Sequence, residues 1–562
     1  MSRRPPRSVR RSRPALTCAI AGLLLGLAAC GGDGSGGDGG EAAASRPNVL
    51  LLTLDTLRAD HLGCYGYRLD TTPAMDRLAE EGVRFADATP STPKTWPSVA
   101  TLLTGTGPRT HGVRYQNRAI AEQLPTLPEL FAAAGYRTGA VVTNFNLQER
   151  YGYGRGVEDY VEAWDAVWDQ LHPGEPLPQD PTERLKKLFG SQRMRALFQA
   201  TGAQFVTDQG LAWLEAQTPA TAEAPATADA SAARGADADP WFLWLHYMDP
   251  HGPYDPPREY LGMFAGEYPE QPVPDLKSPH LHTPKGASEP IRDLGFYIRR
   301  YDQEIRSLDD QLARLFAWLD EAGLREDTLV ILTADHGEAL GQHDYYLEHG
   351  LQPYQECAHV PLVVRWPGHL PAGATVEEPV GLLDLPPTVL ELAGLDVPAV
   401  FEGQSLAGLA RGDADAEAPA HVFMESGDDR FPDRPLQLSV RQGPWKLVHV
   451  RSEEDRAELT GAEFELYDVR ADAGEQRSRA EAEARIVQKL EHELLVWGLR
   501  HPEPGVLSEE DYLDTLEEHE IQMFMQLGYV DGAAFEAWQA RKAARDARDT
   551  GDPGAPSGGE DG

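Results

Sequence analysis

Polar side chains with the chemistry of metal ligands follow three apolar segments of the chain. Asp55 ends the segment RPNVLLLTLD, Asp249 ends WFLWLHYMD with His251 just beyond it, and Asp335 ends DTLVILTAD with His336 next. A single aspartate of this kind is weak evidence of function, because aspartate commonly caps a helix or starts a turn. Three such ends predict a shared site, since ligands bind beyond the carboxyl ends of the strands in an open α/β sheet.

The segment TADHGEALGQHDYYLEHG, residues 333–350, strengthens this interpretation. It holds Asp335, His336, His343 and His349 in one polar loop after an apolar run. A solvated loop has no need of so many imidazoles, whereas clusters of histidine and carboxylate suit divalent metals. We therefore expect a metal site here, although His343 is equally well explained as a hydrogen-bonded polar residue of the loop.

The stretch TPKTWPSVATLLTG, residues 92–105, places a hydroxyl at the expected start of a helix. Thr95 is either a nucleophile or an N-cap, and the two roles can coexist. Pro97 suits the first helical position, and the amides and dipole of a helix start favour an anion there. A metal ion beside the hydroxyl would lower its pKa and activate it for attack.

Alternating strands and helices must position these residues. Apolar runs at 46–55, 138–144, 241–249, 327–335 and 359–366 predict buried strands. Helical spacing of apolar residues predicts a helix ending near Gly323, with its apolar face formed by Ile305, Leu308, Leu312, Leu315, Phe316 and Leu319. The alternation predicts an α/β fold with a mostly parallel sheet between helices.

The rest of the chain differs in composition. LQLSVRQGPWKLVHV and EFELYDV, after about residue 415, predict a small antiparallel sheet, and 218–240, rich in Ala, Thr, Asp and Pro, predicts a disordered insertion. We expect a signal peptide at 1–30, a flexible tether at 31–46, a catalytic domain at 47–415, a C-terminal subdomain at 416–530 and a polar tail at 531–562.

The N-terminus predicts export and lipidation. Six arginines within residues 1–13 precede the apolar run 15–27, which is too short to span a membrane, and LAAC follows, ending at Cys30. The tetrapeptide resembles a bacterial lipobox, which implies cleavage before Cys30 and a lipid anchor on its thiol; a plain secretory signal is the alternative. Gly31 indicates the outer membrane, with the protein facing the periplasm or the cell surface. Two further cysteines, Cys64 and Cys357, could pair or stay free.

Charge limits the partners of the protein. The formal net charge is −38, and loss of the six arginines in the signal would leave about −44. Such a surface repels phosphate backbones, so nucleic acid is not an expected partner. A small or polymeric anionic ester stays possible where a metal makes the site locally positive.

With these motifs in their order, the chain is identified as similar to the sulfatase family of the alkaline-phosphatase-like superfamily. The matching pieces are PNVLLLTLDTLRADHLGCYGY, TWPSVATLLTGTGPRTHGV, HYMDPHGPYDPP, the 333–350 loop and WKLVHV with FELYDV, from about residue 47 to 470. The resemblance implies a sulfatase-like sheet with a smaller C-terminal antiparallel sheet. It makes Asp55, Asp335 and His336 metal ligands, with Thr95 at the metal in the nucleophile position. His251 and His349 match positions that contact the ester or, in relatives with two metals, bind the second ion together with Asp249.

Departures from the family pattern indicate the chemistry. Sulfatases proper convert Cys or Ser at the nucleophile position to formylglycine, which we do not expect for Thr95. Val99 stands where the family has arginine, Thr56 replaces the second aspartate of an Asp-Asp pair, and VVTNF at 141–145 lacks the usual Lys and His. His336 replaces an asparagine of calcium-binding relatives, which favours Mn²⁺ or Zn²⁺, with Ca²⁺ as the alternative.

The expected activity is therefore metal-dependent hydrolysis of a sulfuric or phosphoric ester. Threonine favours a phosphoester, phosphodiester or phosphonate ester over sulfate, because its covalent intermediate must be opened by water or an acceptor. Two alternatives remain: a periplasmic transferase of phospho-headgroups, and a sulfatase-like binding lipoprotein without catalysis.

Overall fold

The computed structural model describes most of the chain between residues 46 and 502. The described residues are 46–114, 118–166, 168, 172, 174–176, 178, 201–218, 239–278, 280–284, 287–427, 437–451, 461–502 and 538–542. The predicted signal peptide and lipobox, and most of the predicted tether, insertion and tail, lie outside these residues. Among the described residues, no helix has the length and apolar character needed to cross a membrane.

A nine-stranded sheet forms the centre of the structure. Its order is β10 (Ala374–Val376), β2 (Val83–Thr89), β9 (Val360–Arg365), β6 (Thr328–Ala334), β1 (Asn48–Leu54), β5 (Trp241–Tyr247), β3 (Arg137–Val142) and β4 (Asp159–Glu162), while β11 (Val380–Gly381) also pairs with β2. Strand β9 is antiparallel to both neighbours, and the other pairs are parallel. The α/β fold class with a mostly parallel sheet is thus confirmed.

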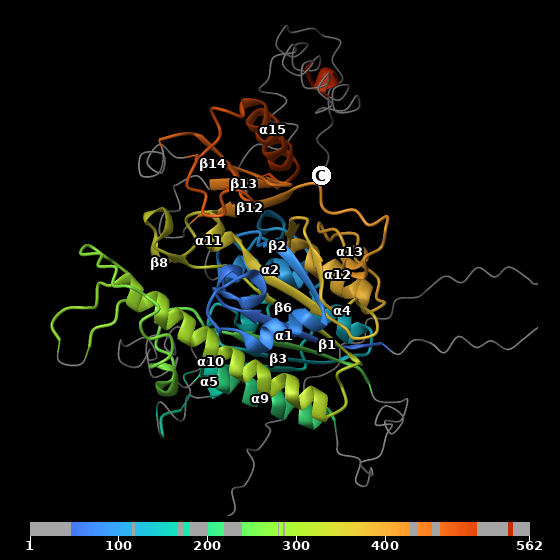
Figure 1. Cartoon of the computed structure of the whole chain (residues 1–562). Coiled ribbons are helices and arrows are strands. Elements are labelled where there is room, and N and C mark those ends of the chain that lie inside the picture. The colour runs from blue at the N-terminus through green and yellow to red at the C-terminus, as the bar shows by residue number, and fades with distance from the viewer. Residues whose placement is uncertain are drawn as a thin grey trace, which may run out of the picture. The chain divides into compact units, whose positions relative to one another are not determined.

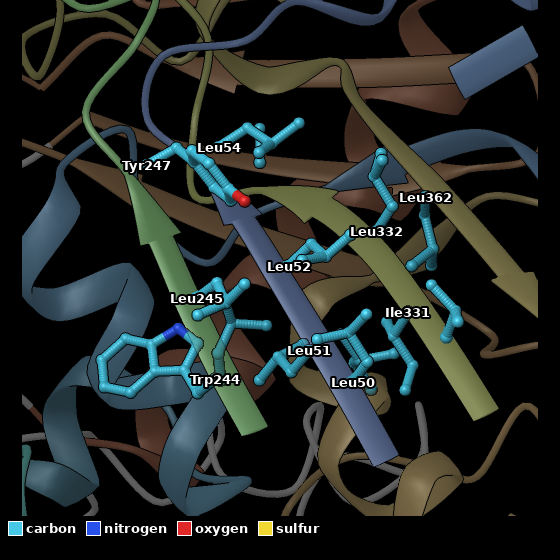
Figure 2. Packing of buried hydrophobic residues seen from close by; sticks show 14 of the residues in the cluster. Leu50, Leu51, Leu52, Leu54, Trp244, Leu245, Tyr247, Ile331, Leu332 and Leu362 are labelled. Carbon is cyan, nitrogen blue, oxygen red and sulfur yellow. The ribbon is translucent and has the colours of Figure 1, made fainter. Parts of the chain in front are cut away.

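The central strands β5, β1 and β6 are apolar on both faces, because helices cover both. Leu50, Leu51 and Leu52 of β1 are almost fully buried against Leu245 and Ile331 (Figure 2). A continuous apolar run, rather than alternation, is the pattern expected for a parallel strand in the middle of such a sheet. This packing fixes where each strand ends, and hence where the polar residue after it lies.

Two residues of β5 show how helices cover the two faces of the central sheet. Phe242 stacks on Phe131 of α4 (Leu127–Ala133), while Leu245 packs against Gly210 of α9 (Ala203–Gln217), where a Cβ would lie 2.9 Å from a Leu245 methyl. Side chains three positions apart in a strand point to opposite faces.

Helix α10 (Leu294–Glu321) lies beside α9 and contacts α1 (Pro73–Glu81) (Figure 1). On the α4 side, α2 (Thr95–Thr104) contacts α12 (Leu385–Leu392) and α3 (Pro108–His111), and α13 (Ala407–Arg411) packs on α12.

The predicted antiparallel sheet is also confirmed. It runs β12 (Val422–Ser426), β13 (Gln437–Gln442), β14 (Trp445–His449) and β15 (Phe464–Asp468), and α15 (Ala484–Arg500) packs on it through Leu490 and Leu494. The 333–350 loop folds back as a short hairpin of β7 (Ala339–Leu340) and β8 (Tyr346–Glu348), followed by α11 (Gln355–Ala358). Helix α5 (Ala163–Ala166) follows β4.

The structure also shows what the patterns missed. The helix predicted around Ile305 begins earlier, at Leu294, with Asp293 as its N-cap, and Gly323 follows its end with a φ of 62°. Strands β2, β4, β10 and β11 had no clear apolar signal. Cys64 and Cys357 are both free thiols.

Candidate active site

Asp55, His246 and Asp335 come together at the carboxyl end of the central sheet. They lie at the ends of β1, β5 and β6, which are adjacent strands, and all three are fully buried. One potential ligand atom from each lies within 4.8 Å of the others. Asp55 Oδ1, His246 Nε2 and Asp335 Oδ2 have no hydrogen-bond partner. Buried polar atoms almost always have one, so two carboxylates and an imidazole with free lone pairs fit a divalent cation.

His246 is held in the orientation that a ligand needs. Its Nδ1 lies 2.8 Å from Thr53 Oγ1, which also accepts a hydrogen bond from Trp244 Nε1 at 2.9 Å. A donor bond from Nδ1 leaves the lone pair on Nε2, which lies 3.5 Å from Asp55 Oδ2. The neighbouring threonine and tryptophan therefore present this imidazole to the carboxylates.

Thr95 is the first residue of α2, and its hydroxyl faces this group. The Oγ1 atom lies 3.2 Å from His336 Nε2 and 3.5 Å from Asp55 Oδ2, and the side chain is 2% exposed. The N-cap position belongs to Lys94, with no side-chain capping bond, so capping does not explain Thr95. The expectation for Pro97 was wrong: it is the third helical residue, because the helix already begins at Thr95.

His336 lies between the nucleophile candidate and the carboxylates. Its Nε2 is 3.5 Å from Asp335 Oδ2 and 3.8 Å from Asp55 Oδ1, while Nδ1 lies 2.9 Å from the Gly337 carbonyl. Burial lowers the pKa of His336, so the ring is neutral with its lone pair on Nε2. This nitrogen can hold a cation or accept a proton from Thr95.

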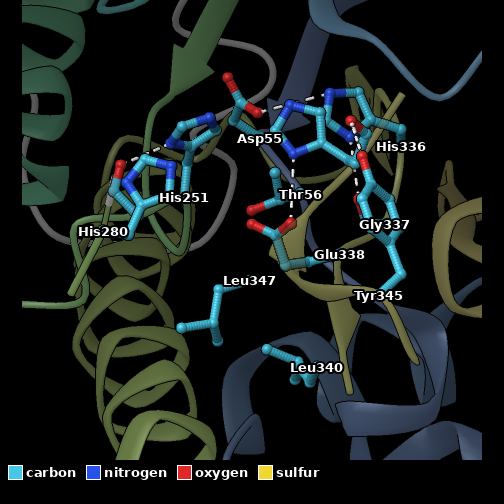
Figure 3. A network of polar contacts seen from close by, with 12 residues as sticks. Asp55, Thr56, His251, His280, His336, Gly337, Glu338, Leu340, Tyr345 and Leu347 are labelled. Atoms are coloured by element: carbon cyan, nitrogen blue, oxygen red, sulfur yellow. Dashed lines mark hydrogen bonds and ion pairs between the residues drawn. The ribbon is translucent and has the colours of Figure 1, made fainter. Parts of the chain in front are cut away.

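Three further histidines line the same site, and Figure 3 labels two of them, His251 and His280. The ring of His349 lies 4.3 Å from that of His336 and 5.2 Å from that of His251, and His280 follows at 5.5 Å from His251. His349 Nδ1 lies 3.2 Å from Glu338 Oε1, and Tyr254 donates to the other Glu338 oxygen. His251 Nδ1 lies 2.6 Å from the Gly252 carbonyl. The contacts at Nδ1 leave the Nε2 atoms of His251 and His349 for other partners in the site.

The charges of the site depend on one another. Burial disfavours ionisation of Asp55, but the charge of His251 and the contact with His246 outweigh it, and the pKa of Asp55 falls below its usual range. Burial and the charge of Asp55 raise the pKa of Asp335 to about 8. Burial also lowers the pKa of His251, but Asp55 and Glu338 outweigh it and raise this pKa above its usual value. Two carboxylates this close favour a bound cation over free ionisation of both.

Asn144 and Lys94 complete the surroundings of Thr95. Asn144 Nδ2 donates to Asp55 Oδ2 at 2.8 Å and to Thr95 Oγ1 at 3.4 Å. The Lys94 ammonium lies 5.1 Å from the ring centre of Trp96, and its charge contributes to lowering the pKa of His349. The segment VVTNF thus contributes the Asn144 amide to the surroundings of Thr95.

Two of the residues singled out in the sequence have different surroundings. Asp249 accepts a hydrogen bond from the backbone of Ala203 at the start of α9, and burial raises its pKa to about 6. His343 lies 2.7 Å from Glu356 and stacks on Tyr354, facing the C-terminal sheet. The structure therefore joins Asp55, Thr95, Asp335, His336, His251 and His349, while Asp249 and His343 lie in neighbouring networks.

Sequence reasoning missed His246, Asn144 and His280. His246 sits inside the apolar run WFLWLHY, where a lone imidazole reads as a core residue. The usable signal was that a histidine in a strand apolar on both faces needs a polar partner. Asn144 and His280 lie in irregular segments and had no such signal.

Comparison with known proteins accounts for this geometry. Residues 47–395 match the family model described as Sulfatase, and residues 341–497 match that of the N-sulphoglucosamine sulphohydrolase C-terminal region. N-acetylglucosamine-6-O-sulfatase of Bacteroides thetaiotaomicron is 22% identical, with 83% of this chain and 87% of the relative covered. Multifunctional alkaline phosphatase superfamily protein PehA of Trinickia caryophylli is 27% identical, with 81% of this chain and 96% of that relative covered.

A solved structure agrees with the sequence matches. Phosphonate monoester hydrolase SpPMH of Silicibacter pomeroyi superposes with a TM-score of 0.62 at 22% identity, covering 82% of this chain and 96% of that one. It shares the α/β fold with its mostly parallel sheet. Since the sulfatase model alone matches more than half of the sequence, the chain belongs to the sulfatase family of ester hydrolases.

Proposed function

We propose that this sulfatase-family hydrolase cleaves phosphoric or phosphonic esters, preferably diesters, with the hydroxyl of Thr95 as nucleophile. The observation that carries the proposal is the position of Thr95 Oγ1, 3.5 Å from Asp55 Oδ2, beside three buried ligand atoms without hydrogen-bond partners. A buried hydroxyl next to a cation site is the arrangement that an activated nucleophile needs.

Asp55, His246 and Asp335 would hold the divalent ion that members of the family use, with His336 as a further donor at the same centre. When bound, the ion supplies positive charge that stabilises the ester's oxygens and lowers the pKa of a neighbouring hydroxyl. Two nitrogen donors beside two carboxylates favour Mn²⁺ or Zn²⁺ over Ca²⁺, which prefers oxygen.

The residues around Thr95 have separate roles in this mechanism. Asn144 and Asp55 fix the direction of the hydroxyl. Its oxygen attacks phosphorus and its proton passes to Asp55 Oδ2, its hydrogen-bond acceptor, as the bond to the alcohol breaks. His349 faces the anion, while Glu338 holds its ring. His251, whose ring lies 5.2 Å from that of His349, gives a proton to the departing alcohol. Water then opens the ester on Thr95: it gives a proton to His251 as its oxygen bonds to phosphorus, and Thr95 recovers its proton from Asp55 as the bond between Thr95 and phosphorus breaks.

Threonine is the reason to prefer phosphorus over sulfur. A formylglycine hydrate can expel sulfate by collapse of its own carbon centre, but a threonine ester has no second oxygen on that carbon. The intermediate must be opened at the acid's central atom, and phosphorus tolerates such attack well. A phosphonate monoester hydrolase with a similar fold is consistent with this preference, although the fold alone does not distinguish phosphorus from sulfur.

A substrate panel with metal analysis tests the proposal. Purified protein loaded with Mn²⁺ or Zn²⁺ is given p-nitrophenyl sulfate, phosphate, a phosphodiester and a phosphonate monoester. We expect the largest kcat/KM for the diester or the phosphonate, an unmodified threonine at position 95, and a transient phosphoryl adduct on that peptide. Efficient hydrolysis of sulfate alone, or an aldehyde at position 95, would contradict the proposal.

A further inference from the structure

A second cavity begins on the far side of His251. It encloses about 550 Å³ between the loop after β5, the start of α9, the short helix η4 (Arg258–Tyr260) and one face of α10. His251 is part of its wall, and the same ring lies between His280 and Asp55 (Figure 3). The cavity is therefore adjacent to the place where the ester would react.

The wall of this cavity is acidic. Five carboxylates line it, against the single guanidinium of Arg258; they are Asp208, Asp249, Asp255, Glu259 and Glu304. Two of the five are compensated by ion pairs, since Asp208 lies 2.8 Å from Arg314 and Asp255 lies 3.1 Å from Arg300. The other three lie on separate segments: Asp249 on the loop after β5, Glu259 on η4 and Glu304 on α10.

Among the five carboxylates of the wall, Glu304 has one oxygen with a hydrogen-bond partner and one without. Its Oε1 accepts the backbone N–H of Asp255 at 2.5 Å, but its Oε2 is buried with no hydrogen-bond partner, and the residue is 5% exposed. Burial, with the charge of the neighbouring Asp249, raises the pKa of Glu304 well above its usual range, so its ionised form needs a cation beside it. Phe205 and Tyr260 also line the cavity. Aromatic faces beside carboxylates are the surroundings in which proteins hold organic ammonium groups.

A metal ion is a poorer occupant. Within the part of the chain that the structure describes, the cluster of donors close enough to hold an ion is Asp55, His246 and Asp335, and it does not include Glu304. The cavity is also far larger than an ion requires and has apolar as well as polar walls. Its chemistry suits an organic cation.

We propose that this cavity binds an ammonium group carried by the ester substrate, with Glu304 as its counter-charge. The inference rests on the proposed function, because it assigns the cavity to a substituent of the ester cleaved at Thr95. The substrates would then be esters of amino alcohols. The anionic centre of such an ester would lie among the histidines, and its cationic end would lie beside Glu304.

The first experiment measures binding and does not depend on turnover. Choline and ethanolamine are titrated calorimetrically into the metal-loaded protein, with the uncharged isostere 3,3-dimethylbutanol as the comparison. We expect at least one of the two cations to bind at least tenfold more tightly than the isostere. The variant Glu304→Gln should lose this preference while folding normally, because its amide oxygen can still accept the Asp255 N–H. Glu321→Gln, at an exposed position of the same helix, is the matched control.

The second experiment measures catalysis. Two phosphodiesters share a p-nitrophenyl leaving group and carry either a 2-(trimethylammonio)ethyl or a 3,3-dimethylbutyl group. We expect wild type to favour the cationic ester in kcat/KM by at least tenfold, and Glu304→Gln to reduce that ratio toward one with little change for the neutral ester. No preference for either cation in binding, or a preference that survives Glu304→Gln, overturns the inference. Cation binding with neither ester cleaved would instead overturn the proposed function alone.

Discussion

His246 Nε2 lies 3.5 Å from Asp55 Oδ2, although His246 is within β5 and Asp55 follows the end of β1. The parallel register explains this approach, because Thr53 is the Cα partner of His246 and Asp55 is two positions further along the same strand direction. Strand pairing therefore brings the imidazole beside the Asp55 carboxylate, whose other oxygen, Oδ1, has no hydrogen-bond partner. Three adjacent strands of the central sheet thus place the three converging donors of the cation site.

This relationship predicts the metal content of variants. His246→Ala and Asp335→Ala should each reduce bound metal and kcat together, because each removes one of three converging donors. Plasma emission spectroscopy of the purified proteins, with circular dichroism for the fold, measures the effect. The exposed His369 provides the control variant His369→Ala, which should keep wild-type metal. Full metal occupancy in Asp335→Ala would remove this carboxylate from the ligand set.

Variants of Thr95 distinguish a catalytic role of its hydroxyl from a structural role. Thr95→Ala should lower kcat by at least roughly a hundredfold, because it removes the attacking oxygen, whereas Thr95→Ser should keep part of the activity. The melting temperature should change little in both, since the Thr95 side chain makes no capping bond. Wild-type kcat in Thr95→Ala, with metal bound, would refute the nucleophile.

Stability should depend on pH through His111. This ring is fully buried, accepts the Val113 N–H on Nδ1 at 3.1 Å, and burial lowers its pKa to about 3. The unfolded chain has a pKa near 6.5 at this residue, so it binds the proton first as pH falls. The contribution of His111 to the free energy of unfolding should therefore be constant above about pH 6.5 and decrease from there toward pH 4, by up to about 1.4 kcal/mol per pH unit.

Urea unfolding at several pH values measures this decrease. The variant His111→Gln should flatten the dependence below pH 6.5, while His369→Gln, at an exposed position, should not. Identical pH dependence in His111→Gln and wild type would show that other groups cause the acid sensitivity.

Sequence patterns predicted the part of the site that lies at strand ends. Asp55 and Asp335 were recognisable because each is a carboxylate directly after an apolar run, and parallel strands bring such ends to one edge. His246 was not recognisable, because a histidine inside a strand can be a core residue or a ligand, and only the packing of both faces of the sheet distinguishes the two. Strand β2, VRFADAT, was missed for a related reason: its polar residues hide a strand that pairs on both sides.

Contacts between distant loops could not be predicted at all. His280 lies 5.5 Å from His251 only because the segment after η4 folds back over the loop after β5. No periodicity or spacing marks such a contact, since it depends on tertiary packing of irregular chain. The position of Asn144 beside Asp55 is of the same kind.

We propose that the protein is anchored to the bacterial outer membrane through Cys30, facing the periplasm or the cell surface. The N-terminal sequence carries this proposal: a basic segment, an apolar run and LAAC. Cys30→Ala should abolish metabolic labelling with a radioactive fatty acid and leave the precursor unprocessed or move the protein to the soluble fraction. A Cys30→Ala protein that is processed and labelled like wild type would disprove the lipobox.

The buried ion pair of Lys446 and Glu475 predicts how the C-terminal sheet supports the active site. The Lys446 Nζ lies 2.9 Å from a Glu475 oxygen, with the two side chains 1% and 0% exposed. Glu475 Oε2 accepts the backbone N–H of Gln355 at 2.6 Å, and its carbonyl lies 3.1 Å from His343 Nε2. Both contacts are to the segment that carries His349. The pair therefore joins β14 to the loop that presents a histidine to the anion.

Removing one partner leaves the other charge buried and unpaired. Lys446→Met should lower the free energy of unfolding by about 3–5 kcal/mol, whereas Lys446→Met combined with Glu475→Gln should recover much of that loss, because no net buried charge remains. Loosening of the loop should also lower kcat/KM in the single variant at temperatures where it is still folded. Urea unfolding and steady-state kinetics on the same preparations measure both effects. If the single variant were as stable as the double variant, the Lys446–Glu475 pair would contribute nothing to holding the loop.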